Sequence, residues 1–341
     1  MSDFLAIITC RNNSERLAGK TMAPIAGNPL LQWLIQRISD PQTGIGAQVV
    51  VATPADPAND PVEALCKKLG IPCHRRESNR DVVGEMDAVV QKYNPKFVMR
   101  CLADAPLQST EVPRRVIHCL RKYPDRDLFF YFIPSWVQPV YGSGNFPITR
   151  RAWSTLAANA KGEEREHPDL WLNRNRHRFN ILYHEGPSNW YYAHQDRIRL
   201  EVDWPEDLEM VRAVAEKGPG MLAPLVGKGG ILPWLQQNEQ YCKNAKLRRE
   251  KTGPTVSYTN EEQGQWRNLM NKADFVLTWE NEVLRPPDGR ALQVFCQSGQ
   301  CLLGWGIDGV LHSVDGSVIG HAPRLGCKCG AGGKWWKKVG G

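Results

Sequence analysis

The sequence predicts an α/β protein built on a doubly wound, mostly parallel sheet, followed by a small cysteine-rich module. Three observations predict this organisation. Short apolar runs alternate with helical patterns along the first two-thirds of the chain. The first apolar run opens into a basic loop punctuated by glycine. Four of the ten cysteines lie together near the C-terminus.

The expected strands are apolar or β-branched runs bounded by polar loops, a pattern typical of strands buried on both faces of a parallel sheet. They lie at residues 3–10, 47–53, 71–75 and 96–104. Helical patterns separate them at residues 29–39, 59–69 and 81–93. The second helix has Asn59 or Asp60 as its N-cap and Pro61 at its first helical position. Because strand and helix alternate with short connections, we expect the strands to run parallel.

Residues 128–150 break this alternation, because they are aromatic and interrupted by Pro and Gly. They predict an extended or hairpin insertion. Further strands are expected at ILYHEG (181–186) and RIRLEVDW (197–204), with a helix at 205–216 capped by its Pro-Glu-Asp turn. The Gly- and Pro-rich residues 217–233 predict the main boundary. The chain would then divide into domains at 1–233 and 234–341.

Composition narrows the class of protein. Apolar residues make up 42% and charged residues 23% of the 341, which is ordinary for a soluble globular protein. No apolar run is long enough to span a bilayer, and the N-terminus begins like a first strand rather than a signal peptide. The net charge of +7 is spread along the chain, which suits small anionic ligands better than nucleic acid. Six singly placed cysteines are typical of buried thiols, so we expect a cytoplasmic protein.

The loop after the first strand carries Arg11, Arg16 and Lys20. Arg and Lys form charge-assisted hydrogen bonds with phosphate oxygens, and Arg can bind two at once. A loop at the carboxyl edge of a parallel sheet is where α/β proteins hold phosphates. The loop therefore predicts a phosphate site, and the alternative is an exposed loop that happens to be basic.

Two acidic residues end predicted strands: Asp104 closes KFVMRCLAD, and Asp203 closes RIRLEVD. We expect both side chains at the same sheet edge as the basic loop. Carboxylates facing bound phosphates are the usual ligands of Mg²⁺. Taken alone, either residue could equally be a helix cap or a loop residue. Together with the loop they predict a magnesium site.

A series of five motifs, in the same order along the chain, resembles a known protein family. It comprises Arg11-x-x-Ser14-x-Arg16-Leu17-x-Gly19-Lys20, Ile25-x-Gly27-x-Pro29-Leu30, Val49–Thr53, Asp104-Ala-Pro-Leu107 and Val202-Asp203-Trp-Pro-Glu-Asp207-Leu208. In this order the chain resembles the cytidylyltransferases that make CMP-activated sugar acids, over about residues 4–216. Asp81-Val82-Val83 and Arg165-Glu166-His167 resemble the spore-coat polysaccharide biosynthesis branch. Residues 236–341 resemble no family that we recognise.

The resemblance implies a nucleotide-diphospho-sugar transferase-like fold and transfer of CMP from CTP to a small sugar-type acceptor in surface-glycan biosynthesis. It implies that Lys20, Arg11 and Asp203 are catalytic and that Asp104 and Asp203 bind Mg²⁺. The substrates would be held by Arg11, Ser14, Arg16, Lys20, Thr53, Glu166 and His167. An ion pair of Arg165 with Glu166 on a helix face accounts equally well for that motif. A homodimer is a further expectation.

The chain departs from the family pattern at two places. Ala18 stands where the loop usually has Pro, and Gly144-Asn-Phe-Pro-Ile148 lacks the Glu common in the spore-coat branch. Two alternatives follow. The chain could transfer another nucleotide, or use a non-sugar acceptor such as a phosphonate. It could also bind nucleotide or glycan without turnover, while its C-terminal module recruits a protein partner or nucleic acid.

The C-terminal cysteines form two closely spaced pairs. Cys296-x4-Cys301 and Cys327-x-Cys329 predict a structural zinc site with four thiolate ligands, although the spacing differs from the usual pair of two-residue turns. Four unrelated thiols or a disulfide are the alternatives. A module with few aliphatic runs would gain folding free energy from bound zinc.

Overall fold

The computed structural model of the chain describes residues 2–76, 81–131, 142, 144, 146–184 and 198–243, together with six strands nearer the C-terminus. Its contacts group into two units. The first comprises Met1–Leu128, Val140–Asn175 and His194–Gly253, and the second comprises Phe129–Pro139, Arg176–Ala193 and Pro254–Gly341. Each unit is described by itself, and the expected domain division at residue 233 stays a prediction.

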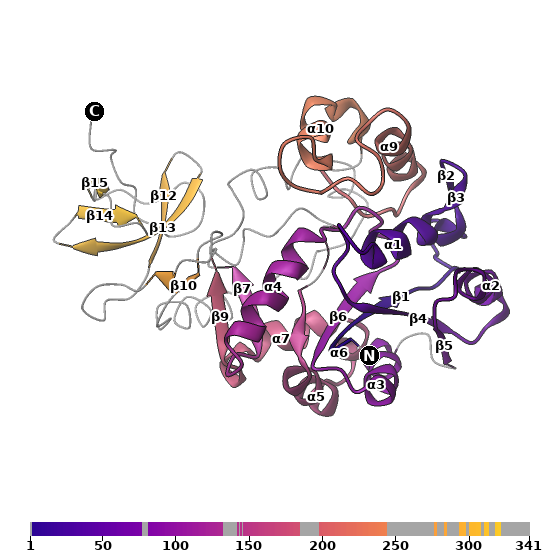
Figure 1. Cartoon of the computed structure of the whole chain (residues 1–341), viewed down its shortest axis with the longest axis horizontal. Helices are drawn as coiled ribbons and strands as arrows, with labels where there is room; N and C mark the ends of the chain where they lie inside the picture. The colour runs from indigo at the N-terminus through magenta and orange to yellow at the C-terminus, as the bar shows by residue number, and fades with distance from the viewer. Residues whose placement is uncertain are drawn as a thin grey trace. The chain divides into compact units, whose positions relative to one another are not determined.

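A five-stranded sheet forms the centre of the first unit, in the order β5-β4-β1-β6-β8 (Figure 1). Its strands are β1 (Phe4–Thr9), β4 (Gln48–Pro54), β5 (Cys73–Arg76), β6 (Phe97–Leu102) and β8 (Ile148–Thr149). The first four pair in parallel, and β8 runs antiparallel to β6. The prediction of a mostly parallel α/β sheet is therefore confirmed.

Helices α1 (Leu30–Ser39), α2 (Asp60–Leu69) and α3 (Val82–Tyr93) lie where the helical patterns predicted them. Helix α4 (Glu111–Lys122) was not predicted. Pro61 is the second residue of α2 rather than its first. Asn59 does not cap α2 with its side chain, because its Oδ1 accepts a hydrogen bond from the backbone N–H of Asn12 (2.8 Å). This bond fastens the basic loop to the start of α2.

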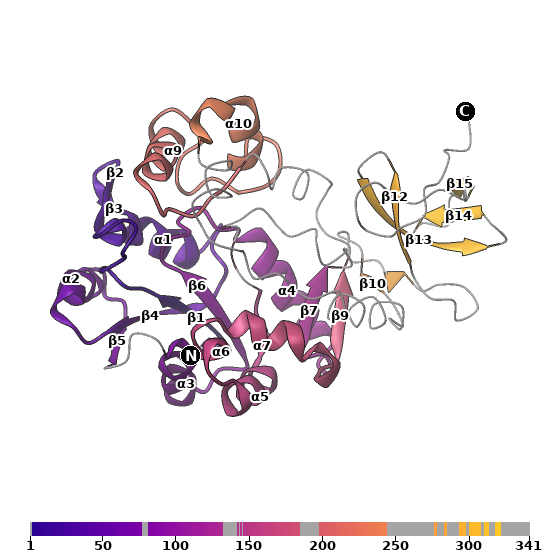
Figure 2. The ribbon, with the colours of Figure 1, turned by 180° about the vertical axis from the view of Figure 1, so that it is seen from behind.

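Helices α3, α5 (Arg150–Asn159), α6 (Glu163–Glu166) and α7 (Pro168–Arg174) pack together (Figure 2). Trp153 donates from its indole N–H to Asp87 (3.0 Å), and Arg165 forms two hydrogen bonds with Asp81 (2.8 and 2.9 Å). These contacts join α5 and α6 to α3. The right-handed crossover rule places α3 on the sheet face opposite α1.

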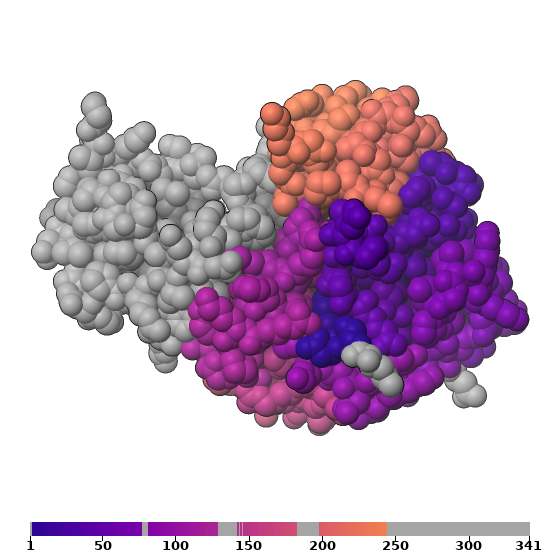
Figure 3. Space-filling model, in the orientation of Figure 1, coloured from indigo at the N-terminus to yellow at the C-terminus, as the bar shows by residue number. Residues whose placement is uncertain are grey.

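Helices α9 (Pro205–Glu216) and α10 (Ile231–Gln237) complete the described part of the first unit. Figure 3 shows their orange surface beside the indigo surface of the N-terminal residues. Contacts between α9 and β2, and hydrogen bonds from Arg212 to the Pro24 carbonyl, lie at this border. The short elements of this unit are β2 (Pro24–Ile25), β3 (Asn28–Pro29) and the 3-10 turns Lys20–Met22, Pro57–Asn59 and Glu239–Tyr241, and the 3-10 turn Arg176–Arg178 belongs to the second unit.

The expected strand at residues 197–204 is wrong. Residues 198–204 run extended and form no strand, apart from a single bridge at Arg199. Ile198, Leu200 and Val202 are fully buried. The charged Arg199 and Asp203 beside them are buried as well (3% and 1% exposed), so the apolar–charged alternation that predicted a strand does not mark an exposed face. The Val202 N–H bonds the Asp104 carbonyl (2.7 Å) instead of a neighbouring strand.

Most of the expected insertion at residues 128–150 lies outside the described residues. Its described parts are β7 (Leu128–Tyr131) at its start and β8 at its end. In the second unit, β7 belongs to a sheet of order β11-β10-β9-β7, with β9 (Ile181–His184), β10 (Val276–Leu277) and β11 (Val283–Leu284). Strand β9 confirms the prediction at ILYHEG.

A four-stranded antiparallel meander ends the described part of the second unit. It consists of β12 (Gln293–Gln297), β13 (Gln300–Ile307), β14 (Val310–Ser313) and β15 (Val318–His321). Cys296 and Cys301 stand opposite each other in the β12–β13 pair. Cys327 and Cys329 lie outside the described residues. Across the part of the chain with assigned structure, we find no helix able to cross a membrane.

The core of the first unit contains a buried arginine. Arg37 of α1 is 2% exposed and donates to the carbonyls of Gln108 (2.6 Å), Met221 (2.9 Å) and Ala223 (2.6 Å). Burial lowers the pKa of its guanidinium group to about 10, although the negative charge of Glu111 opposes this shift. The side chain thus ties α1 to the loop after β6 and to the segment between α9 and α10.

We predict that Arg37→Met lowers the free energy of unfolding by about 2–4 kcal/mol, because three buried carbonyls lose their donor while the aliphatic volume is kept. Urea denaturation followed by circular dichroism measures this. Arg121→Met is the control, since Arg121 is half exposed and pairs with Asp3 at the surface; its effect should stay within about 0.5 kcal/mol. Equal effects of the two variants would contradict the assignment.

Candidate active site

The loop after β1 turns inward at Gly19, which adopts a left-handed conformation (φ +73°). Its N–H bonds the carbonyl of Asn12 (2.9 Å), and the Thr21 hydroxyl bonds the Asn12 side chain (2.8 Å). A residue with a Cβ rarely adopts this φ. The glycine therefore permits the turn that carries Lys20 from the solvent-exposed loop into a buried position.

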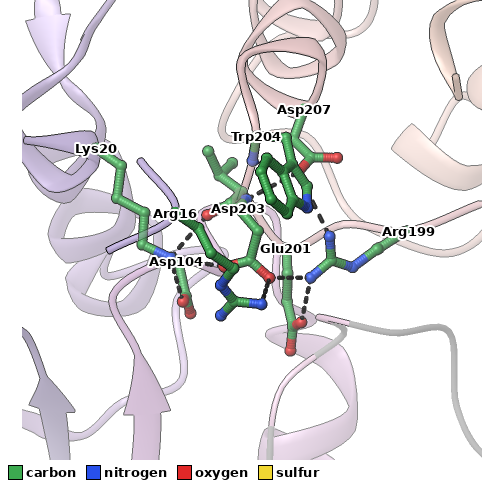
Figure 4. Close-up of polar contacts among 9 residues, drawn as sticks. Arg16, Lys20, Asp104, Arg199, Glu201, Asp203, Trp204 and Asp207 are labelled. Carbon is green, nitrogen blue, oxygen red and sulfur yellow. Dashed lines mark hydrogen bonds and ion pairs between the residues drawn. The ribbon is translucent and has the colours of Figure 1, made fainter. Parts of the chain in front are cut away.

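Lys20 is 5% exposed, and its ammonium group uses all three of its N–H donors. It contacts Asp104 Oδ2 (2.7 Å), Asp203 Oδ1 (2.9 Å) and the Val202 carbonyl (2.9 Å), as Figure 4 shows. Lys20 comes from the first loop, Asp104 follows β6, and Val202 and Asp203 lie in the segment before α9. One buried cation therefore joins the two predicted carboxylates.

Asp203 is 1% exposed and accepts from two further cations. Its Oδ2 pairs with Arg16 (2.8 Å) and with Arg199 (Figure 4). Burial alone would raise the pKa of Asp203, but the charges and hydrogen bonds of Lys20 and Arg199 outweigh it and hold the pKa below its usual range. Asp203 is therefore ionised at neutral pH.

Asp203 is positioned by the start of α9. Asp207 Oδ2 accepts from the backbone N–H groups of Asp203 (2.8 Å) and Trp204 (2.9 Å), and Pro205 is the first helical residue. This cap confirms the predicted turn. Arg199 also contacts Glu201 (3.0 Å) and Asp207 (3.4 Å), so it neutralises three acids at once.

The structure brings together four of the residues singled out from the sequence: Arg16, Lys20, Asp104 and Asp203. Asp104 lies at the carboxyl edge of β6 as expected. Asp203 reaches the same place from an extended segment rather than from a strand.

The other predicted residues surround this cluster less closely. Arg11 is exposed, Ser14 is half-buried in the same loop, and neither forms a hydrogen bond within the described residues. Thr53 lies in β4, fully buried, with a hydroxyl that has no hydrogen-bond partner. Glu166 is half-buried at the end of α6, and His167 is exposed between α6 and α7. Arg165 pairs with Asp81, so the alternative ion pair with Glu166 is wrong.

Sequence reasoning missed Arg199, Glu201 and Asp207 as parts of the site. A signal was present, because charged residues alternate with buried apolar ones from Ile198 to Asp203. In an extended segment, alternate side chains point to opposite sides. That pattern places Arg199, Glu201 and Asp203 on one side, where Figure 4 shows them together.

A parallel sheet with a basic loop and two carboxylates at its carboxyl edge defines a nucleotide-binding α/β protein. The sequence profile of the family described as Cytidylyltransferase matches residues 5–243. The chain therefore belongs to the cytidylyltransferase family, and the resemblance found in the sequence is confirmed. The profile ends near the start of the C-terminal module, for which the sequence suggested no family.

Two curated relatives and one solved structure illustrate the likeness. The spore coat polysaccharide biosynthesis protein SpsF of Bacillus subtilis (strain 168) is 24% identical over 221 residues, covering 64% of this chain and 88% of SpsF. The 3-deoxy-manno-octulosonate cytidylyltransferase 1 of Hydrogenovibrio crunogenus is 24% identical over 234 residues, covering 62% and 83%. A cytidylyltransferase from Leptospira borgpetersenii superposes with a TM-score of 0.61 at 19% identity, covering 76% and 100%. That likeness shows a shared fold.

We predict that Asp203→Asn destabilises the protein by about 3 kcal/mol at pH 7, because three cations lose their buried counter-charge. The pKa of Asp203 is lower in the folded protein than the ~3.9 of an unfolded chain, so its stabilising effect is present above ~3.9. The effect is lost as the pH falls through the lower, native pKa. Urea denaturation of both proteins between pH 7 and pH 3 measures the difference. A difference independent of pH would contradict a role for the ionised carboxylate.

Proposed function

We propose that this chain transfers CMP from CTP to a hydroxyl group of a sugar-type acceptor and releases pyrophosphate. The observation that carries the proposal is the Lys20–Asp104–Asp203 cluster behind a basic loop at the carboxyl edge of the sheet. Family membership and the names of the two relatives support the choice of CTP and of a glycan pathway.

Arg11 and Arg16 would donate hydrogen bonds to the phosphate groups of CTP. Arg11 forms no ion pair within the described residues, and Arg16 is 43% exposed and uses only one of its nitrogen atoms on Asp203. Both therefore keep N–H groups for phosphate oxygens. Lys20 has no donor left, so it would reach a phosphate only by leaving one of its three acceptors. In the structure, the positive charge of Lys20 offsets the negative charges of Asp104 and Asp203.

The oxygen ligands of a magnesium ion would come from Asp104 and Asp203. Only Oδ2 of Asp104 is bonded, which leaves Oδ1 of this 27%-exposed side chain without a partner in the described structure. Both oxygens of the buried Asp203 are held by Lys20, Arg16 and Arg199, so Asp203 would bind the ion only by leaving one of these partners. The described residues contain no group of three or more candidate ligands. Mg²⁺ commonly takes one or two carboxylates together with substrate phosphates. When bound, it would neutralise charge on the triphosphate.

The base would lie near the end of β4. Thr53 supplies a fully buried hydroxyl without a partner, one residue from the end of that strand. A buried polar group without a partner costs free energy unless a ligand satisfies it. We therefore assign Thr53 and the backbone beside it to recognition of the cytosine.

We predict that purified protein releases pyrophosphate with CTP and Mg²⁺ in the presence of an acceptor, and at least tenfold more slowly with ATP, GTP or UTP. Asp104→Asn should lower kcat by about a hundredfold or more, because loss of a charge-stabilising group costs several kcal/mol. Asp87→Asn is the control, since Asp87 lies on α3 and accepts from Trp153. Turnover with another nucleotide alone would overturn the base assignment. CTP binding without release would favour the non-catalytic alternative.

We further propose that the four C-terminal cysteines hold a structural zinc ion. Support comes from the register of the β12–β13 pair, in which Cys296 and Cys301 stand opposite each other. Cys327 and Cys329 complete the thiolate set in the sequence.

We predict about one zinc ion per chain by inductively coupled plasma mass spectrometry after purification without added metal. The double variant Cys327→Ser/Cys329→Ser should lose that metal. The matched control, Cys66→Ser/Cys119→Ser, changes two thiols of the first unit and should retain it. A zinc content well below one ion per chain in the wild-type protein would contradict the proposal.

A further inference from the structure

Asn12, near the start of the basic loop, uses its backbone and its whole side chain in hydrogen bonds. Its N–H donates to Asn59 Oδ1 (2.8 Å), and its side-chain amide N–H donates to the Ala58 carbonyl (3.1 Å). Its carbonyl accepts from the Gly19 N–H (2.9 Å), and its Oδ1 accepts from the Thr21 hydroxyl (2.8 Å). Each of the four polar groups of Asn12 is therefore bonded within the protein.

These bonds close the loop at its base and fasten it on two sides. Asn59 ends the 3-10 turn before α2, and Thr21 lies in the 3-10 turn that follows the loop. The two side chains are 0% and 1% exposed, so both partners that hold Asn12 are themselves fixed by packing. The positions of Asn12 and Gly19, where the loop begins and ends, are therefore set by buried neighbours.

The loop between these two points, residues 13–18, forms an arch with few contacts of its own. Its backbone N–H groups donate no hydrogen bond to any residue that the structure describes. The Leu17 carbonyl accepts from the Lys20 N–H (3.3 Å), and the Arg16 side chain pairs with Asp203. The shape of the arch therefore depends mainly on the bonds of Asn12 at its base.

A row of free backbone N–H groups with cations beside it suits a chain of phosphate groups. Arg11 and Arg16 outnumber Glu15, which is the one acid among residues 11–18. Such a loop binds an anion more tightly when its backbone already has the bound shape, because little conformational entropy is then lost on binding. The hydrogen bonds of Asn12 supply that shape without the ligand.

We propose that Asn12 is a positioning residue that holds the loop in the shape required to bind the triphosphate chain of the nucleotide. The proposal rests on the transferase function proposed above, and it assigns the loop to the phosphates rather than to the base. Asn12 acts through the loop, because its own polar groups are all engaged.

The test measures the dissociation constants of CTP and of inorganic tripolyphosphate, each with Mg²⁺, by calorimetry. Asn12→Ala should raise both constants about tenfold or more and by a similar factor, because the variant must order the loop on binding and the loop contacts only phosphates. Asn159→Ala is the matched control, since Asn159 is an exposed residue of α5 that donates to the Thr155 carbonyl. It should leave both constants within twofold of the wild-type values.

A second pair of variants removes one of these bonds without changing Asn12. Thr21→Val keeps the branched shape but loses the hydroxyl that donates to Asn12 Oδ1. It should raise both dissociation constants about threefold or more, whereas Thr21→Ser keeps a hydroxyl and should stay within twofold of the wild type. Thermal unfolding of each variant separates loss of the loop shape from loss of the fold.

Unchanged dissociation constants in Asn12→Ala, or equal effects of Thr21→Val and Thr21→Ser, would overturn the proposal. So would a wild-type protein that binds neither CTP nor tripolyphosphate. Failure of the transferase function alone has a different signature: tripolyphosphate would still bind more weakly to Asn12→Ala than to the wild type, while no pyrophosphate is released from CTP.

Discussion

The buried ammonium group of Lys20 is the interaction on which the site depends. It joins Asp104 to Asp203 and to the Val202 carbonyl, across separations of 84, 183 and 182 residues in the sequence. Two carboxylates this close would repel each other in a buried position, and each would lose hydration without a counter-charge. The lysine therefore offsets the charge of both acids where the sheet ends. Arg16 and Arg199 extend the same neutralisation on the side of Asp203.

The sequence predicted strands and helices best where burial determines the local pattern of apolar residues. The runs that became β1, β4 and β6 are mostly apolar and buried, as expected for strands covered on both sheet faces. The edge strand β5 (Cys73–Arg76) is polar and half-buried. The helical patterns between the strands held to within two residues. The residues 198–204 misled, because apolar and charged residues alternate there although the segment forms no strand. Asp203 was nevertheless identified as a site residue, because it belongs to a motif that resembles the family and that does not depend on the predicted strand.

What the sequence did not predict was pairing across long separations. Arg165 stands beside Glu166 in the chain, yet it pairs with Asp81 on α3. Arg37 looks like an ordinary charged residue of an amphipathic helix, but it is buried against three carbonyls.

The most direct test of the account is a double-mutant cycle on Lys20 and Asp203, read as the free energy of unfolding at pH 7. The single variants Lys20→Met and Asp203→Asn each remove one of the opposite charges that surround the buried partner. Removing both should therefore cost less than the sum of the single losses, with a coupling of about 2 kcal/mol or more. Single losses that add to within about 0.5 kcal/mol would show that the two side chains act independently, and would contradict the account.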